Sequence, residues 1–392
     1  MKLFQRLLVA PAALGLLAPI SANANEVNLN EISNYSDLEN FELANSFNND
    51  ELKENTLLAG GEGLVDDHSH AGGFSTTTSA SFSVDFAIGA VDGKDVVKKR
   101  LSNALFVDSS NETVQTAYGY QIDLSTSFTG EDALSVSLDA GAGGTALAEL
   151  DLNSTDDKLT VDGITYSFPV GDKLTVLVGD STDGSALYST ACVYGGFTNT
   201  LDDCGNYSSA FTTTGTSSVG FSASYDIGGG YSAAIGYAGA GTGAGIGTKA
   251  GTDYYGAQLA YTGDNFGASF TYADLDTKRA YGINSYVAFD SNLPSLSFGY
   301  EFTAMREDEI KDDTQWFAGL QWDEIGPGTL GIAAGNKGPQ KDGGTEEFAY
   351  EAFYAYSVND SMTITPAVFI LENNLADEVD ETGIVVKTSF SF

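Results

Sequence analysis

This 392-residue chain contains only two histidines, the side chains best suited to acid–base chemistry near neutral pH. Both histidines, His68 and His70, lie in the run Asp66-Asp67-His68-Ser69-His70, whose imidazoles and carboxylates are of the types that bind zinc. Since glycines flank this run, we expect weak adventitious binding there and no functional metal site. A His-assisted hydrolase needs an imidazole beside its nucleophile, and residues 79–392 contain no histidine. The sequence therefore predicts neither an enzyme nor a cofactor.

Cys192 and Cys204 are the only cysteines. In an exported protein such a pair predicts a disulfide that staples one loop, and the lack of a nearby histidine disfavours a metal site. The pair lies within residues 180–215, where the charged residues are all acidic: Asp180, Asp183, Asp202 and Asp203. A narrow passage lined by carboxylates favours cations. Alternatively, these aspartates are ordinary turn residues of a solvated loop.

Alternating segments elsewhere place acidic residues on their polar side. These positions, which we expect to face a lumen, are Asp85, Asp123, Asp139, Asp226, Glu301 and Glu351, with Lys387 as the clear basic member. The main basic cluster, Lys94 with Lys98, Lys99 and Arg100, falls in a predicted first loop. It could line the opposite wall or bind anionic surface sugars, and a solvated loop is the simpler interpretation.

The last ten residues indicate which elements position these side chains. Every second residue suits a lipid-facing surface: Phe392, Phe390, Thr388, Val386 and Ile384. Outer-membrane barrels end in this way, because the last strand closes against the first and leaves no edge. The ending, with Phe390 and Phe392, resembles the C-terminal signature of bacterial outer-membrane proteins. That resemblance implies recognition by the barrel-assembly machinery.

Short polar or glycine-rich turns separate alternating segments throughout the chain. Seven such turns lie at residues 129–132, 169–173, 228–230, 262–265, 291–294, 324–328 and 359–361. With a first strand at residues 79–90 and the C-terminal strand, they predict an all-β fold, a transmembrane antiparallel β-barrel of about 16 strands (14 to 18). The eight connections between these turns are expected to be long extracellular loops. A barrel of this size encloses an aqueous channel.

Composition agrees with this architecture. The 46 Gly, 20 Tyr and 23 Phe are typical of an all-β chain with many tight turns. The formal net charge of −37 excludes nucleic acid as a partner, because binding phosphates requires clustered Lys and Arg.

The N-terminus predicts export. Lys2 and Arg6 precede an apolar stretch at residues 7–17, and Ala22-Asn23-Ala24 matches a cleavage site, so residues 1–24 are a predicted signal peptide cleaved after Ala24. Residues 25–73 are rich in Asn and Glu without alternation and predict an acidic, mostly disordered periplasmic segment. Residues 74–392 are the predicted barrel domain, located in the outer membrane.

Several segments carry a family resemblance. They are MKLFQRLLVAPAALG at residues 1–15, FSTTT at 74–78, YSFPVGD at 166–172, YEAFY at 350–354, VND at 358–360 and TITPA at 363–367. Together they resemble cyanobacterial outer-membrane porins, some described as iron-uptake and others as carbohydrate-selective. Family members usually carry an S-layer-homology domain and a coiled coil where this chain has residues 25–73, so the resemblance does not extend to cell-wall tethering.

The resemblance implies passive permeation of small solutes and inorganic ions, contact with outer-membrane lipid or lipopolysaccharide, and a homotrimer. In general porins, which the architecture also resembles, the third extracellular loop folds into the lumen. The predicted function is therefore diffusion of small hydrophilic solutes, with a preference for cations, through a lumen narrowed by residues 180–215. The alternatives are a surface receptor barrel with little transport and a metal-specific, for example iron-specific, uptake porin.

Overall fold

A computed structural model describes residues 78–93, 96–99, 105–108, 113–142, 146–202, 204, 218–240, 245–249, 251–289, 293–307, 309–373 and 380–392. The predicted signal peptide, the acidic segment, both histidines, Lys94, Arg100 and Asp203 lie outside these residues. Lys98 and Lys99 lie in a short strand of which only the backbone is described. Within the described part of the chain, no helix has the length and apolar character needed to cross a membrane.

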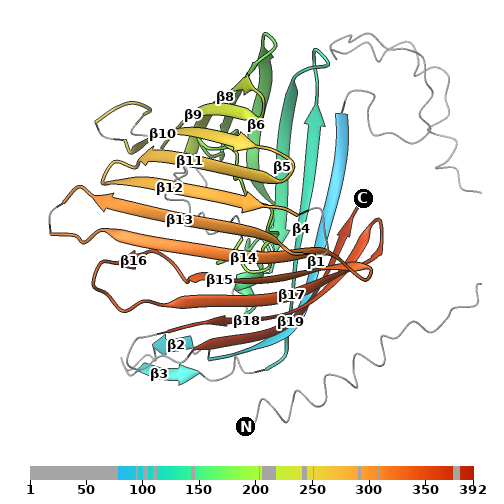
Figure 1. Cartoon of the computed structure of the whole chain (residues 1–392). Coiled ribbons are helices and arrows are strands. Elements are labelled where there is room, and N and C mark those ends of the chain that lie inside the picture. Colours follow the sequence, from blue (N-terminus) through green and yellow to red (C-terminus); the bar gives the residue numbers. More distant parts are fainter. Residues whose placement is uncertain are drawn as a thin grey trace, which may run out of the picture. The chain divides into compact units, whose positions relative to one another are not determined.

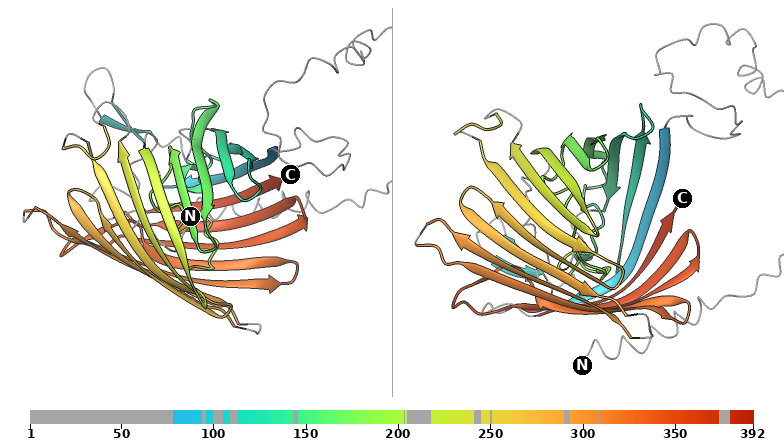
Figure 2. Two further views of the ribbon diagram at one scale, coloured as in Figure 1. Left: turned by 90° about the horizontal axis from the view of Figure 1, so that it is seen from above. Right: turned by 45° about the horizontal axis from the view of Figure 1, so that its top comes forward.

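Sixteen long antiparallel strands form a closed barrel (Figures 1 and 2). The predicted all-β barrel of sixteen strands is confirmed. The strands are β1 (Thr78–Asp92), β4 (Gln115–Thr126), β5 (Ala133–Gly141), β6 (Thr160–Val170), β7 (Leu174–Asp180), β8 (Ser218–Gly228), β9 (Tyr231–Ala240), β10 (Asp253–Thr262), β11 (Phe266–Asp274), β12 (Lys278–Val287), β13 (Ser295–Met305), β14 (Asp313–Ile325), β15 (Gly328–Asn336), β17 (Phe348–Asn359), β18 (Met362–Leu371) and β19 (Glu381–Ser391).

Three short strands complete the list of β elements. β16 (Gln340–Lys341) pairs with the start of β14 at the rim and adds a seventeenth member to the sheet without spanning it. β2 (Val96–Lys99) and β3 (Leu105–Asp108) pair with each other in a separate two-stranded ribbon. A single 3₁₀ turn, η4 (Ala148–Leu150), lies between β5 and β6.

The barrel closes between β1 and β19, as the C-terminal residues predict. Their antiparallel register runs from Ser83 opposite Ser391 to Asp92 opposite Thr382. Phe82 and Phe392 extend it by exchanging two backbone hydrogen bonds of 2.8 and 3.0 Å. Their rings stack with centroids 5.7 Å apart. In Figure 2 the first strand (blue) lies beside the last (dark red).

The strand connections alternate between short and long, with one departure from the expectation. The seven predicted short turns lie on one rim, together with the start of β1 and the end of β19. The prediction of eight long loops is wrong at β11–β12, where only residues 275–277 intervene. Asp276 there adopts a left-handed conformation (φ 65°), and Leu275 N donates to Lys278 O at 2.9 Å. These features close a tight turn in place of the expected long loop.

The outer wall is apolar and carries aromatic pairs near both rims. Tyr237 packs against Tyr255, and Tyr272 against Tyr281, near the long-loop rim. Tyr231 and Tyr261 pack together near the short-turn rim. Aromatic girdles at two levels are typical of barrels that cross an outer membrane.

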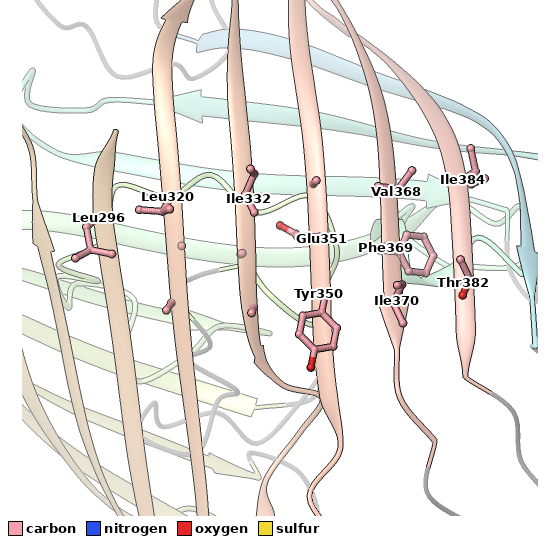
Figure 3. A pocket seen from close by; sticks show the side chains of 15 residues that line it. Leu296, Leu320, Ile332, Tyr350, Glu351, Val368, Phe369, Ile370, Thr382 and Ile384 are labelled. Atoms are coloured by element: carbon pink, nitrogen blue, oxygen red, sulfur yellow. The ribbon is translucent and has the colours of Figure 1, made fainter. Parts of the chain in front are cut away.

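A shallow hollow of about 580 Å³ lies on this outer wall over β13 to β19 (Figure 3). Small side chains at Ala318, Ala334 and Ala352 sit among larger exposed ones such as Leu320 and Ile332. Because most of its larger side chains belong to the exposed apolar face, the hollow opens on the outside of the barrel.

Candidate functional site

The loop between β7 and β8 (residues 181–217, hereafter the third loop) lies against the inner wall of the barrel. Its described residues are 181–202 and 204. From β8 to β17, inward polar side chains on six strands bond successive parts of it: Ser222, Gln258, Asn284, Ser297, Gln321 and Glu351. These contacts satisfy backbone groups that would otherwise be buried without partners.

Gln258 on β10 shows how this attachment works. Its Oε1 accepts a hydrogen bond from Ser189 N at 2.7 Å, and its Nε2 donates to Ser189 O at 2.8 Å. Asn284 Nδ2 donates to Thr190 O at 2.9 Å, and Ser297 Oγ accepts from both Val193 N and Tyr194 N at 3.2 Å. The loop thus follows the wall from strand to strand.

Glu351 on β17 makes the strongest attachment. It accepts hydrogen bonds from Tyr194 Oη (2.7 Å), Phe197 N (3.0 Å), Thr198 N (2.8 Å) and Thr198 Oγ1 (2.5 Å). Burial raises the pKa of the Tyr194 hydroxyl above its ordinary value, and the Glu351 carboxylate raises it further, so the hydroxyl remains a donor. Glu351 faces inward, as alternation predicts, but at 3 % exposure it holds the loop and does not border the passage.

The loop between β5 and β6 (residues 142–159, hereafter the second loop) also enters the barrel. Glu149 connects it to the third loop: Asn199 N donates to Glu149 O, and Thr200 Oγ1 to Glu149 Oε2, both at 2.8 Å. Leu147, Leu150 and Leu152 are buried with side chains of the third loop and the inner wall, in a cluster that includes Leu201, Phe317, Phe353 and Phe369. The sequence analysis missed this role. The leucines at 147, 150 and 152, unusual for a solvated loop, were the available signal.

Glycines on the wall make room for these loops. A Cβ at Gly299 would lie 2.1 Å from Cys204 O, and one at Gly236 would lie 1.9 Å from Gly184 O. Cys204 is joined to Cys192 by a disulfide with a Cα–Cα distance of 6.1 Å. The disulfide therefore lies within the part of the loop that contacts the wall.

The sequence-predicted carboxylates fall into three groups. Asp123 and Asp139 are half-buried on the inner faces of β4 and β5, where Asp123 accepts from Ser137 Oγ at 2.6 Å and Asp139 from Thr160 Oγ1 at 2.5 Å. Asp85 on β1 lies 3.9 Å from Lys387 Nζ. The same ammonium group lies 5.4 Å from the ring centre of Phe197 in the third loop, so the loop reaches this part of the wall.

Glu301 is buried and accepts a hydrogen bond from Gln315 Nε2 at 3.1 Å. Its carboxylate, like that of Glu351, therefore belongs to the packed wall.

The remaining aspartates lie at a turn, at the end of β7 and along the third loop. Asp226 is exposed at the β8–β9 turn, where it accepts from Gly228 N at 2.8 Å. Asp180 is exposed at the end of β7, Asp183 is exposed at the start of the third loop, and Asp202 is half-buried further along it. The described residues contain no group of three or more His, Cys, Asp or Glu placed to hold a metal ion.

Comparisons with known proteins agree at the level of the fold. No protein-family model matches the chain, and no curated protein sequence matches it. A high-pH structure of Pseudomonas putida OprB is similar, with 10% identity, a TM-score of 0.59, and coverage of 81% of this chain and 94% of that one. A triple mutant of the Rhodopseudomonas blastica porin has 13% identity and a TM-score of 0.54, over 80% of this chain and 100% of that one. The chain therefore has a porin-like barrel fold.

Proposed function

We propose that the protein is an outer-membrane porin that allows passive diffusion of small hydrophilic solutes and inorganic ions and prefers cations. The observation that carries this proposal is the third loop, which is bonded along the inner wall of a sixteen-strand barrel with an apolar exterior. A barrel of this size encloses water, and a loop attached to its inner wall narrows the passage.

The proposed cation preference rests on the uncovered charges of the inner wall. Asp123 and Asp139 carry no described basic partner, whereas Asp85, on the neighbouring strand β1, lies 3.9 Å from Lys387 Nζ. Carboxylates in a narrow passage raise the local concentration of cations. We propose Asp180 at the end of β7 and Asp183, Asp202 and Asp203 of the third loop as further contributors.

Reversal potentials across a planar bilayer with a salt gradient test this proposal. A unit charge 4 Å from a passing ion contributes about 1 kcal/mol even in water, which is about a factor of five. Asp123→Asn with Asp139→Asn removes two such charges and should therefore lower the cation-to-anion permeability ratio by about fivefold or more. Asp226→Asn, at an exposed turn, is the matched control and should change nothing. Anion preference of the wild type, or equal ratios in all variants, would refute the charge assignment.

The same experiment separates the alternatives. Because the second and third loops both occupy the interior, a receptor barrel with little transport is the second candidate, and absence of conductance would favour it. An iron-specific porin would instead show saturable passage of that cation.

The proposal also covers localisation, processing and assembly. We propose that the signal peptide is cleaved after Ala24, that the barrel lies in the outer membrane, and that residues 25–73 lie in the periplasm. The proposal includes a homotrimer and, separately, recognition of Phe390 and Phe392 by the barrel-assembly machinery. Support comes from the sequence patterns and from the seam where Phe392 pairs with Phe82.

A further inference from the structure

Three charged side chains meet at the long-loop rim of β11, β12 and β13. Arg306 Nη2 lies 2.5 and 2.6 Å from the two carboxylate oxygens of Asp274. Arg279 Nε lies 3.8 Å from Asp274 Oδ2. Two guanidinium groups thus share one carboxylate, which leaves an excess of one positive charge within this trio. The exposed carboxylates of Asp276 and Glu307 are close in sequence to it.

The trio lies on the outer face of the barrel. Asp274 is directly opposite Arg279 in the β11–β12 register, and Arg279 alternates onto the same face as Ile283, which is 48 % exposed. Ala280 and Asn284, on the opposite face, are buried. On β13, Ala304 lies directly opposite Arg279. Arg306 comes two positions after Ala304, so the alternation of side chains returns it to the same outer face.

An aromatic belt fixes the depth of this site. Tyr272 packs on Tyr281 with centroids 5.4 Å apart, and Tyr281 stacks on Phe302 at 6.3 Å. Asp274 and Arg279 lie two residues beyond Tyr272 and Tyr281, which is about 7 Å further toward the rim. Aromatic belts mark the level where lipid headgroups begin, so the guanidinium groups lie at headgroup level.

The site is held by a rigid support. The β11–β12 connection is three residues long, and Arg306 N donates to Thr277 O of that turn at 2.9 Å. Beneath it, Ala273, Leu275 and Ala280 form a buried apolar cluster. The arginine backbones are therefore fixed beside Asp274.

We infer that Arg279 and Arg306 bind the phosphate of an anionic lipid headgroup in the outer leaflet. Each guanidinium carries five N–H donors, and the shared carboxylate of Asp274 uses only part of this set. Planar guanidinium groups match phosphate oxygens in pairs, which an ammonium group does not. These are the only two arginines among the described residues. The inference rests on the proposed membrane embedding and is independent of what the channel transports.

Native mass spectrometry of the refolded full-length protein in detergent tests it, with diphosphorylated lipid A as the probe. Arg279→Gln with Arg306→Gln should weaken lipid A binding about tenfold or more, since both charge-assisted contacts are lost. Lys311→Gln with Lys341→Gln removes the same charge from the same rim and should leave binding unchanged. The conservative pair R279K and R306K should bind with intermediate affinity, and it checks that the loss does not come from misfolding.

Three outcomes would overturn the inference: equal weakening in the lysine pair, equal binding of dephosphorylated lipid A, or full competition by inorganic phosphate at micromolar concentration. The last would identify a site for free phosphate. Conductance in planar bilayers should be the same for the arginine pair and the wild type. Failure of lipid binding and failure of the porin proposal are therefore distinguishable.

Discussion

At the scale of single residues, the inner face contains carboxylates with different roles that alternation cannot distinguish. Alternation places Asp123 and Glu351 on the same side of the barrel, and the structure does so too. The third loop then covers Glu351 and leaves Asp123 half-buried, because Glu351 faces the backbone N–H groups of Phe197 and Thr198. Their roles depend on contacts between residues about 150 positions apart, which strand periodicity does not encode.

The Glu351 contacts lead to a prediction about how firmly the loop is held. In Glu351→Gln one carboxylate oxygen becomes an NH₂ group facing N–H and O–H donors. Losing even one hydrogen bond to a charged group costs about 1.5–3 kcal/mol. We expect an unfolding midpoint at lower urea concentration and open-channel current with larger fluctuations. Glu324→Gln, which makes the same change at an exposed position near the end of β14, is the control and should alter neither quantity. Unchanged noise in Glu351→Gln would show that this carboxylate does not hold the loop.

At the scale of elements, the strands were predictable and the positions of the loops were not. Turn residues and alternation are local signals, so they gave sixteen strands and the seam between β1 and β19. The three-residue β11–β12 turn was missed because its flanking strands continue their alternation almost to the turn. The entry of the second loop was missed because it depends on the space left by wall glycines, a feature of the assembled barrel. The predicted lumen-facing set mixed covered and uncovered carboxylates for the same reason.

Gly299 tests the fit between the third loop and the wall. In Gly299→Ala the new Cβ would lie 2.1 Å from Cys204 O, closer than atoms approach in proteins. The loop must therefore shift near its disulfide, and overpacking of this kind costs about 1–3 kcal/mol. We expect a lower melting temperature and an altered single-channel conductance. Gly338→Ala is the matched control, since a Cβ there meets nothing within 4 Å. Equal behaviour of the two variants would contradict the packing described here.

At the scale of the whole molecule, the barrel is one cooperative unit only if its first and last strands pair. The seam joins residues about 300 positions apart, and a barrel without it would expose two strand edges. Apolar side chains continue across the seam on the outer face, where Phe86 meets Phe390 and Phe82 meets Phe392. Phe392 is therefore part of the barrel wall. Its contribution to stability can be measured as a coupling free energy between Phe392 on the last strand and Phe82 on the first.

A double-mutant cycle on Phe82 and Phe392 measures that coupling. Each Phe→Ala change should lower the free energy of unfolding in lipid bilayers, and the double variant should lose less than the sum, because the stacked ring pair is counted twice. Aromatic pairs contribute about 0.5–1.5 kcal/mol beyond their buried area, which sets the expected coupling energy. The matched cycle pairs Phe392 with Phe266, whose ring packs on Tyr261 at another part of the wall, and should be additive. A coupling energy near zero for Phe82 and Phe392, with both single variants folded, would mean that the seam is open in the membrane.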